Sequence, residues 1–346
     1  MKKVVGIYCG YVVGHYWDEC SLNSGIGGSE TWAIYVSAEL QKRGYHVIVF
    51  NETETWHFSA DGVEYVPFQM FNDRCQYQHF DYFITSRRTE EIDYNISCDN
   101  IFLMMHDLSL FNDDFKLDRI KKIGCLSNFH AENTKAIYPG VKFRKDNFFI
   151  TCNGVNHDLY KETFQKENMM VWSSCRERGL PQFMDYVYPL IKEKVPDFKV
   201  IFADYNSIPY NDDRLEYKSC LSKKELAELQ LRSKIWIYPA TFYETFCITA
   251  VENAMAGNAI ITTDIGALPD TLKGYKGIFG NNYLDFACNV DVESYKKTAE
   301  KIAEMAVILL QNESLRFNYA REAYNICKDY TWEKAADSWE QIFRMN

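Results

Sequence analysis

Two glutamates at a suggestive spacing lie in the second half of the chain. The segment from Glu244 to Glu252 reads Glu-Thr-Phe-Cys-Ile-Thr-Ala-Val-Glu and follows the strand-like apolar run 235–239. A helix that opens near Phe246 would present free N–H groups at the end of that strand, and such groups bind anions such as a diphosphate. A spacing of eight puts both glutamates on nearly one helical face, where one could hydrogen-bond a sugar and the other ribose hydroxyls. Taken alone, the spacing is more typical of an ordinary amphipathic helix.

A glycine-rich loop, Ser-Gly-Ile-Gly-Gly-Ser-Glu at 24–30, follows the first strand-like run. Gly27 and Gly28 would permit close backbone approach to a ligand and unusual dihedral angles, although a simple turn has the same composition. The loop lacks the Gly-x-Gly-x-x-Gly fingerprint of dinucleotide-binding proteins. His106 follows the apolar run 101–105, and ligands of parallel sheets bind at such strand ends.

Short apolar runs alternate with amphipathic segments, which is typical of α/β proteins with parallel sheets. The predicted strands are 4–8, 47–51, 82–85, 101–105, 123–126, 148–151, 168–173, 198–203, 235–239 and 259–263. The predicted helices are 31–43, 183–194, 223–233, 248–256, 293–311 and 314–328, and a last helix begins at a capping Thr331. A polar stretch at 153–166 predicts a domain boundary. We therefore expect two doubly wound domains, 1–160 and 161–330, followed by the helix 331–346.

Composition excludes several classes of protein. Lys and Arg number 38 and Asp and Glu 48, so the net charge is −10, and a protein that neutralises nucleic-acid phosphates usually carries a basic field instead. No run approaches the roughly 20 apolar residues of a membrane span. The eleven cysteines are widely spaced without a Cys-x-x-Cys, so neither a disulfide framework nor a zinc site is expected. We expect a cytoplasmic protein; peripheral membrane contact and the oligomeric state stay open.

The text around the two glutamates resembles a known family. Residues 238–257, together with Ala-Ile-Ile-Thr-Thr-Asp-Ile-Gly-Ala-Leu-Pro-Asp at 259–270, are similar to the donor-site signature of the family 4 retaining glycosyltransferases, the glycosyltransferases group 1 type with the GT-B fold. The resemblance extends over nearly the whole chain. It implies two Rossmann-like domains facing a central cleft, with the acceptor bound by 1–160 and the donor by 161–330. It also implies that the last helix packs back on the first domain.

The resemblance assigns donor-binding roles in the second domain. Glu244 would orient the sugar as a catalytic residue, and Glu252 would hold the ribose. Arg178 falls on the family's phosphate-binding lysine, whereas Ser173 falls on its arginine, a loss that Arg176 could offset. The remaining donor-binding residues are Thr245, Phe246, Cys247 and Ile248. The family usually has glycine where this chain has Thr245 and Cys247, and the side chains there would narrow the space beside the donor.

Other candidates lie in the first domain. Gly27 and Gly28 match the family's Gly-Gly loop, which implies that they bind the donor. His106 lies where the family often carries a histidine near the donor sugar and acceptor, which implies a catalytic role. His130 is a weaker candidate of the same kind. Three residues before the glycine-rich loop could reach an acceptor, although only their location supports them: His15, Asp18 and Glu19.

The implied reaction transfers a hexose from a UDP- or GDP-linked sugar to a hydroxyl of a glycan or glycoconjugate, with retention and without a metal or other cofactor. The aspartate pairs Asp113-Asp114 and Asp212-Asp213 lie in polar loops and are not expected to bind a metal. Two alternatives stay open. One is a non-catalytic protein that binds sugar nucleotides. The other is a different enzyme of the same fold, such as an epimerase or an enzyme that glycosylates modified DNA bases, although the acidic charge disfavours DNA.

Overall fold

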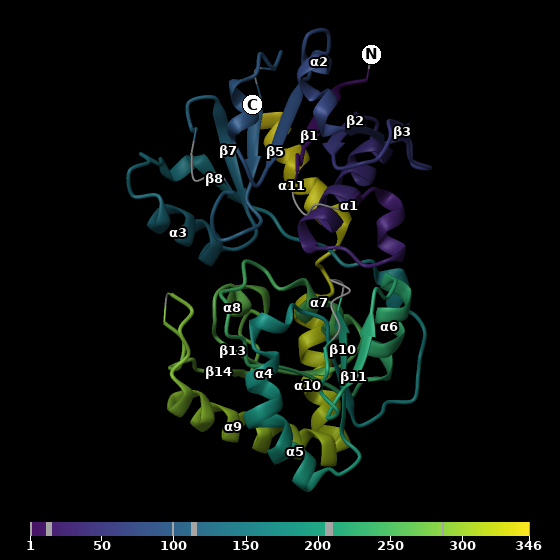
Figure 1. The fold of residues 1–346 in the computed structure, drawn as a ribbon, viewed down its shortest axis with the longest axis vertical. Coiled ribbons are helices and arrows are strands. Elements are labelled where there is room, and N and C mark those ends of the chain that lie inside the picture. The colour runs from purple at the N-terminus through teal and green to yellow at the C-terminus, as the bar shows by residue number, and fades with distance from the viewer. Residues whose placement is uncertain are drawn as a thin grey trace. The chain divides into compact units, whose positions relative to one another are not determined.

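The computed structural model of the chain describes residues 2–11, 16–98, 100–111, 116–204, 210–285 and 287–345. They form two compact units (Figure 1). The first contains the residues up to Leu22, Ile26–Gly154 and the residues from Thr331 onward; the second contains Asn23–Gly25 and Val155–Tyr330. Residues 155–160, which were expected in the first domain, thus belong to the second unit. His15 and Asp113-Asp114 lie outside the described residues.

A parallel sheet of eight strands forms the first unit, in the order β3-β4-β2-β1-β5-β6-β7-β8. Its strands are β1 (Val4–Tyr8), β2 (His46–Asn51), β3 (His57–Phe58), β4 (Glu64–Pro67), β5 (Tyr82–Ser86), β6 (Ile101–Met104), β7 (Ile120–Cys125) and β8 (Phe148–Ile150). Every pair is parallel except β3 with β4. Because the chain builds outward from β1 to one edge and then from β5 to the other, the switch point lies between β1 and β5, and ligands of such sheets bind beyond it.

Helices cover this sheet, and the last of them comes from the far end of the chain. They are α1 (Gly28–Lys42), α2 (Phe71–Cys75), α3 (Asn128–Ile137) and α11 (Trp332–Met345), with short 3₁₀ turns η1 (Glu19–Asn23), η2 (Phe68–Met70), η3 (Glu90–Asp93) and η4 (Lys145–Asn147). On α11, the buried Trp332 ring stacks on Tyr35 of α1 with centroids 5.0 Å apart, and Trp339 meets Trp32 edge-on at 5.9 Å. The predicted return of the last helix to the first unit is confirmed, because its aromatic face is buried there.

The second unit contains two three-stranded parallel ladders, β11-β10-β9 and β12-β13-β14. Its strands are β9 (Met169–Trp172), β10 (Lys199–Asp204), β11 (Glu216–Ser219), β12 (Ile235–Tyr238), β13 (Ala259–Thr263) and β14 (Ile278–Phe279). β9 and β12 lie side by side, with the rings of Trp172 and Tyr238 5.1 Å apart. The resulting order repeats the doubly wound pattern, so the switch point of this unit lies between β9 and β12.

The helices of the second unit are α4 (Leu180–Gln182), α5 (Tyr188–Lys194), α6 (Lys223–Arg232), α7 (Ile248–Met255), α8 (Leu268–Thr271), α9 (Val292–Gln311) and α10 (Glu313–Cys327). The 3₁₀ turns η5 (His157–Tyr160) and η6 (Arg176–Arg178) precede them. The predicted helix over 183–194 begins as a π-helical turn, Phe183–Val187, and α5 follows directly at Tyr188 with Pro189 in its first turn. A proline ring cannot supply the amide that a continuous helix needs, so the regular α-helix starts there.

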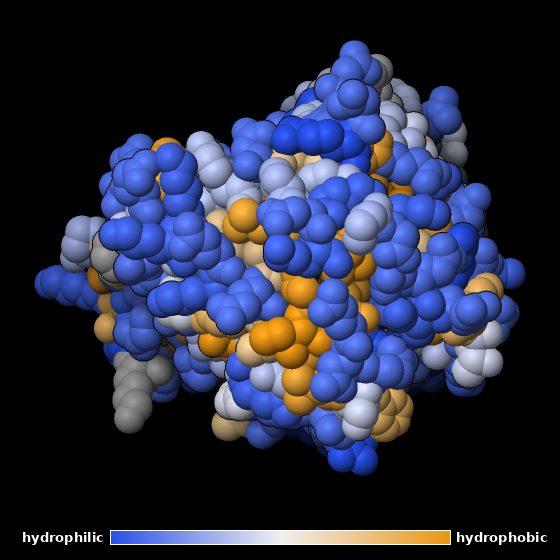
Figure 2. Space-filling view, turned by 90° about the horizontal axis from the view of Figure 1, so that it is seen from below, coloured by the Kyte–Doolittle hydropathy of each residue, from blue (hydrophilic) through white to orange (hydrophobic). Residues whose placement is uncertain are grey.

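The surface seen from below is mostly hydrophilic, with a narrow apolar strip (Figure 2). Exposed large apolar side chains of the second unit include Leu190 on α5, Ile308 on α9 and Phe317 on α10. Among the described helices, none combines the length and apolarity needed to cross a bilayer. All eleven cysteines are free, as expected from their spacing.

One carboxyl group of the first unit is buried in the protein interior. Glu91 of η3 is fully buried, and neither of its carboxyl oxygens has a hydrogen-bond partner among the described residues. Burial raises the pKa of Glu91 to about 8, and the nearby Arg88 and Lys116 only partly oppose this effect. The folded chain therefore holds a proton that the unfolded chain, with a pKa of 4.5, releases.

We predict that the free energy of unfolding falls between pH 5 and pH 8, by about 3 kcal/mol from this group. The stabilisation is complete below the unfolded pKa and is lost as the pH rises through the folded pKa. Urea unfolding at the two pH values measures the difference. Glu91→Gln cannot ionise and should lose much less stability over this range, whereas Glu132→Gln, at a site 73% exposed, should behave like the wild type. Equal pH dependence in Glu91→Gln and the wild type would contradict the prediction.

Candidate functional site

Two loops meet at the switch point of the second unit. Arg178 ends the turn η6 that follows β9, and Glu244 follows β12. The Arg178 Nη1 atom lies 2.9 Å and 3.1 Å from the two carboxylate oxygens of Glu244. The Glu244 side chain is only 6% exposed, whereas that of Arg178 is 33% exposed. A buried carboxylate and a solvent-accessible cation are thus joined at the position where doubly wound sheets bind ligands.

Further contacts fix the Glu244 carboxylate. The hydroxyl of Tyr238, at the end of β12, donates to Glu244 Oε1 at 2.7 Å. Burial raises the pKa of Tyr238 well above its ordinary value, and Glu244 adds to the effect, so the phenol stays a donor. A Cβ at Gly266 would lie 2.6 Å from the backbone N and O of Glu244, and the amide of Ala267 donates to Glu244 O at 2.8 Å. Both the backbone and the carboxylate of Glu244 are therefore held in place.

Glu252 has a different environment. It lies on α7 and is almost fully buried, with Lys223 Nζ 3.1 Å from its Oε1 and Gln230 Nε2 3.4 Å from its Oε2. The expectation that the two glutamates share a helical face is wrong, because α7 begins at Ile248 and Glu244 precedes it. Lys223 is a neighbour of Glu252 that was not predicted from the sequence, although the Ser-x-x-Glu capping box that begins at Ser222 marks the helix start next to it.

The start of α7 contains a strained backbone. Cys247 precedes the helix with φ 70° and ψ 74°, the left-handed conformation that favours glycine. The position where the family usually has glycine thus keeps the glycine conformation with a cysteine side chain. Phe246 is buried edge-on against Tyr330 at 5.2 Å, and Thr271 Oγ1 donates to Phe246 O at 2.5 Å. Thr245 and Ile248 on either side are half-buried.

The loop after β9 supplies the other predicted donor-site residues. The Oγ atom of Ser173 is buried and has no hydrogen-bond partner among the described residues. Arg176 pairs with Glu177 at 3.3 Å and lies 5.7 Å from the ring of Tyr210. A second cation therefore lies in the same turn as Arg178, although nothing places Arg176 on the Glu244 carboxylate.

The glycine-rich loop occupies the corresponding place in the first unit. Gly27 has φ −67° and caps α1, and Gly28 is the first residue of that helix. The expectation that these two glycines adopt unusual dihedral angles is therefore wrong. The absence of a side chain at Gly27 lets the Glu30 carboxylate approach the backbone closely, since a Cβ there would lie 2.4 Å from Glu30 Oε2.

A second residue missed in the sequence, Arg87, ties this loop to the neighbouring strands. It follows β5 directly and has a left-handed backbone with φ 70°. Its Nη1 donates to Ser29 Oγ at 2.8 Å and to Glu30 Oε1 at 3.1 Å, and its Nε donates to Asp107 Oδ2 at 2.5 Å. The arginine thus connects the start of α1 with the loop after β6. Its position immediately after a buried strand at the switch point is the signal that could have found it.

The two histidines near this network are both neutral. His106 is buried with its ring 4.9 Å from Trp32, and burial, together with Arg87 and His130, holds the pKa of His106 well below its ordinary value. Burial also lowers the pKa of His130 to about 4. His130 Nδ1 accepts from the amide of Leu126 at 3.3 Å, so Nε2 carries the hydrogen that bonds Asp107 O at 2.9 Å. Both nitrogens of His130 are committed to the backbone, which is a structural role.

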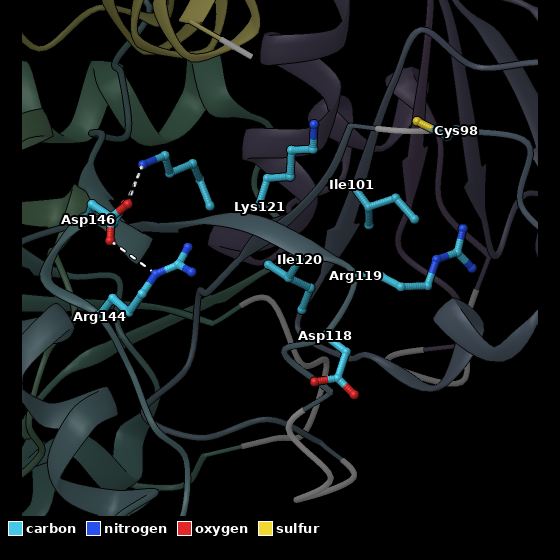
Figure 3. Close-up of a pocket in the computed structure, with 9 residues that line it drawn as sticks. Cys98, Ile101, Asp118, Arg119, Ile120, Lys121, Arg144 and Asp146 are labelled. Carbon is cyan, nitrogen blue, oxygen red and sulfur yellow. Dashed lines mark hydrogen bonds and ion pairs between the residues drawn. The ribbon is translucent and has the colours of Figure 1, made fainter.

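A cavity of about 540 Å³ in the first unit lies elsewhere (Figure 3). Ile101 and Ile120, which line it, are the first residues of β6 and β7, so the cavity opens at the amino-terminal ends of the strands. Asp146 lies between Arg144 and Lys122 and pairs with both. The charges of this cavity are in part neutralised within it, and it is separate from the switch point.

Comparisons with known proteins identify a family match and a shared fold. Residues 188–325 match the family model described as "Glycosyl transferases group 1". The chain also resembles solved structures over 99–100% of its length. The sucrose-phosphate synthase of Thermosynechococcus elongatus has a TM-score of 0.70 at 11% identity, with 99% of that chain covered. The catalytic domain of Arabidopsis thaliana starch synthase IV, bound to ADP and acarbose, has a TM-score of 0.66 at 11% identity, also with 99% covered.

A third structure, Anabaena HepE in complex with UDP and glucose, has a TM-score of 0.63 at 11% identity, with 99% of that chain covered. A search of curated protein sequences found no match. At these identities the structures show the fold, so the predicted fold class is confirmed. The matched family segment contains Glu244, Glu252 and Lys223, and it begins after Arg178.

The strained backbone at Cys247 leads to a test of stability. Cys247→Gly and Cys247→Ala both remove the thiol, but only glycine relieves the left-handed conformation, which costs other residues roughly 1–2 kcal/mol. We predict that Cys247→Gly has the higher free energy of unfolding of the two, by about 1 kcal/mol. Urea unfolding of both variants measures this difference.

A matched pair at a buried strand position provides the control. Cys125 ends β7 and is fully buried without a left-handed backbone, so there Cys125→Ala should be more stable than Cys125→Gly. The same order of stability at both positions would contradict the strain at Cys247.

Proposed function

Because residues 188–325 are a glycosyl transferases group 1 domain, we propose that this glycosyltransferase moves a hexose from a nucleotide diphosphate sugar to a hydroxyl of a glycan or glycoconjugate, with retention of anomeric configuration. The donor in this proposal is UDP- or GDP-linked. The observation that carries it is the Arg178–Glu244–Tyr238 cluster at the switch point of the second unit, beside the start of α7.

The cluster suits a diphosphate and a sugar at once. The first amides of α7 have no partner within the helix, and the helix dipole adds partial positive charge there. Arg178 keeps a third of its side chain exposed while it bonds Glu244, so a phosphate oxygen can approach the guanidinium from solvent. Glu244, held from three sides, would accept hydrogen bonds from sugar hydroxyls. Preorganised groups of this kind favour departure of the diphosphate without a metal ion.

Glu252 would hold the ribose hydroxyls. Its carboxylate bonds Lys223 and Gln230, so a ribose would compete with or join these donors. Lys223 is half-buried beside it, and its cation would favour a nucleotide that brings negative charge to this end of the site. Ser173, whose buried Oγ has no partner among the described residues, would supply one more hydrogen bond in the place of the family's arginine.

Same-face attack, in which the leaving phosphate takes the acceptor proton, is the route we propose to retention. In the first unit, His106 is neutral at physiological pH and would act as a hydrogen-bonding group rather than as a cation. Glu30 and Asp107 are both engaged by Arg87, which lowers their availability as nucleophiles. The anomeric coupling in the proton NMR spectrum of the product tests retention directly.

The donor is identified by thermal unfolding in the presence of UDP-, GDP- and ADP-sugars. A ligand that binds only the folded chain raises the midpoint by mass action, and we expect one nucleotide series to do so at micromolar concentration. Glu252→Ala should reduce the shift of the nucleotide series that binds, because the ribose contact is lost. A shift that is equal for all three nucleotides would contradict a specific nucleotide site.

Replacement of Glu244 tests the catalytic assignment. We predict that Glu244→Gln reduces the rate of sugar transfer by about 100-fold or more, the range measured when one preorganised polar group is removed. Binding of the free nucleoside diphosphate, measured by calorimetry, should change little, because Arg178 and the start of α7 remain. In the proposed complex the Glu244 carboxylate contacts the sugar, which the free nucleoside diphosphate lacks.

Glu193→Gln on the exposed surface of α5 is the matched control and should transfer at the wild-type rate. Unchanged turnover in Glu244→Gln would refute the role of this residue. Tight donor binding by the wild type without any transfer or hydrolysis would instead indicate a non-catalytic sugar-nucleotide-binding protein.

A further inference from the structure

A mixed group of nitrogen and oxygen donors lies in the first unit, outside the network around Arg87. It consists of Asp18, Glu19 at the start of η1, and His57 on β3. His57 Nε2 lies 3.2 Å from Glu19 Oε2 and 3.9 Å from Asp18 Oδ2, and one ligand atom from each residue falls within 4.8 Å of the others. The three side chains are 27–31% exposed, so ions can enter from solvent.

The histidine ring is oriented by its surroundings. Its Nδ1 lies 2.9 Å from the carbonyl oxygen of Thr55, which can only accept, so Nδ1 carries a hydrogen. The ring stacks on Tyr65 with centroids 5.3 Å apart and planes 9° apart. In the neutral ring, Nε2 therefore presents a lone pair towards two carboxylates. Metal-binding histidines are commonly held in this way, with the second nitrogen bonded to a backbone carbonyl.

The acidic side of the group is also anchored. The amide of Trp17 donates to Glu52 O at 3.1 Å, and Asn51 Nδ2 donates to Trp17 O at 2.6 Å, which holds the backbone before Asp18 against the end of β2. Asp18 Oδ1 accepts from the amide of Cys20 at 2.9 Å, so Oδ2 is the oxygen that faces His57. Three possible ligand atoms from two separate segments thus converge: His57 Nε2 lies within hydrogen-bond distance of Glu19 Oε2, and Asp18 Oδ2 lies near both. Either a cation or a proton on Nε2 would offset the charge of the two carboxylates.

We propose that Asp18, Glu19 and His57 bind a divalent transition-metal ion of the Zn²⁺ type. One imidazole nitrogen and two carboxylate oxygens are ligands that zinc accepts, with water completing the coordination. Neighbouring ligands of a tetrahedral zinc ion with bonds of about 2.0–2.1 Å lie roughly 3.3 Å apart. The His57–Glu19 distance of 3.2 Å already fits, and rotation of the Asp18 side chain would close its 3.9 Å distance.

The site would join η1, which precedes the glycine-rich loop, to β3 at the edge of the sheet. A metal there stabilises the first unit by linking two segments that are distant in the chain. It is separate from the donor chemistry, for which Arg178 and α7 carry the phosphate charge. A proton on His57 Nε2 competes with the metal. It would form a hydrogen bond with one of the two carboxylates and leave the other carboxylate without a bond to the ring.

Calorimetry of the full chain, stripped of metal with EDTA, against ZnCl₂ and MnCl₂ tests the site. We expect one zinc ion per chain, and a rise in the thermal midpoint with zinc. His57→Ala should weaken zinc binding by at least about 10–100-fold, the loss that outer-shell partners alone produce. Glu19→Gln should weaken it as well, which keeps the test decisive if His57→Ala is poorly folded.

Two control variants test whether zinc binds at Asp18, Glu19 and His57 rather than at another side chain. His79→Ala is the matched control, because His79 is exposed and bonds Ser97 rather than a carboxylate; it should bind zinc like the wild type. Cys20→Ser should also bind normally, because the exposed thiol beside Asp18 is not one of the ligands. Absence of zinc binding, binding unchanged in both His57→Ala and Glu19→Gln, or binding abolished by Cys20→Ser would each overturn the proposal.

Discussion

The site in the second unit depends on one ion pair, between Arg178 and Glu244. The two residues come from loops after β9 and β12, which the chain connects only through more than sixty intervening residues but which the sheet brings together. A carboxylate buried as deeply as Glu244 is costly unless it is paired and hydrogen-bonded, and Arg178 and Tyr238 together provide the pairing. The pair therefore determines which way the carboxylate points, and Gly266 admits the backbone that supports it. A donor that bound here, as proposed, would meet groups whose positions are set before it binds.

The first unit also has an arginine–glutamate ion pair at its switch point, but there the glutamate precedes the arginine in the chain. There the arginine, Arg87, follows the strand on the far side of the switch point, and the glutamate, Glu30, lies at the start of the helix after the near strand. Asp107 and Ser29 complete the network. Each sheet thus closes its own switch point with an arginine–glutamate contact, since polar loop residues at that position need charged partners more than packing partners.

Backbone strain occurs beside both of these networks. Arg87 and Cys247 are two of the four non-glycine residues with a positive φ in the described part of the chain, and each adjoins one of the two networks. Such conformations persist only where surrounding contacts determine them, and they are frequent at ligand sites. At Cys247 the strain places the first turn of α7 directly behind Glu244. At Arg87 it turns the guanidinium back towards the glycine-rich loop.

Much of this protein followed from local sequence signals, because strands and helices are encoded by the spacing of apolar residues. The buried runs 235–239 and 259–263, the glycine-rich loop and the aromatic face of the last helix all indicated their elements correctly. Short elements without such a run, such as β3, β4, β11 and β14, were missed, since they depend on neighbours for their hydrogen bonds. The partners of charged residues could not be predicted either. Helical spacing suggested a shared face for Glu244 and Glu252, but the turn at Cys247 separates them, and only the folded sheet brings Arg178 to one and Lys223 to the other, because ion pairs form between loops that are distant in the chain.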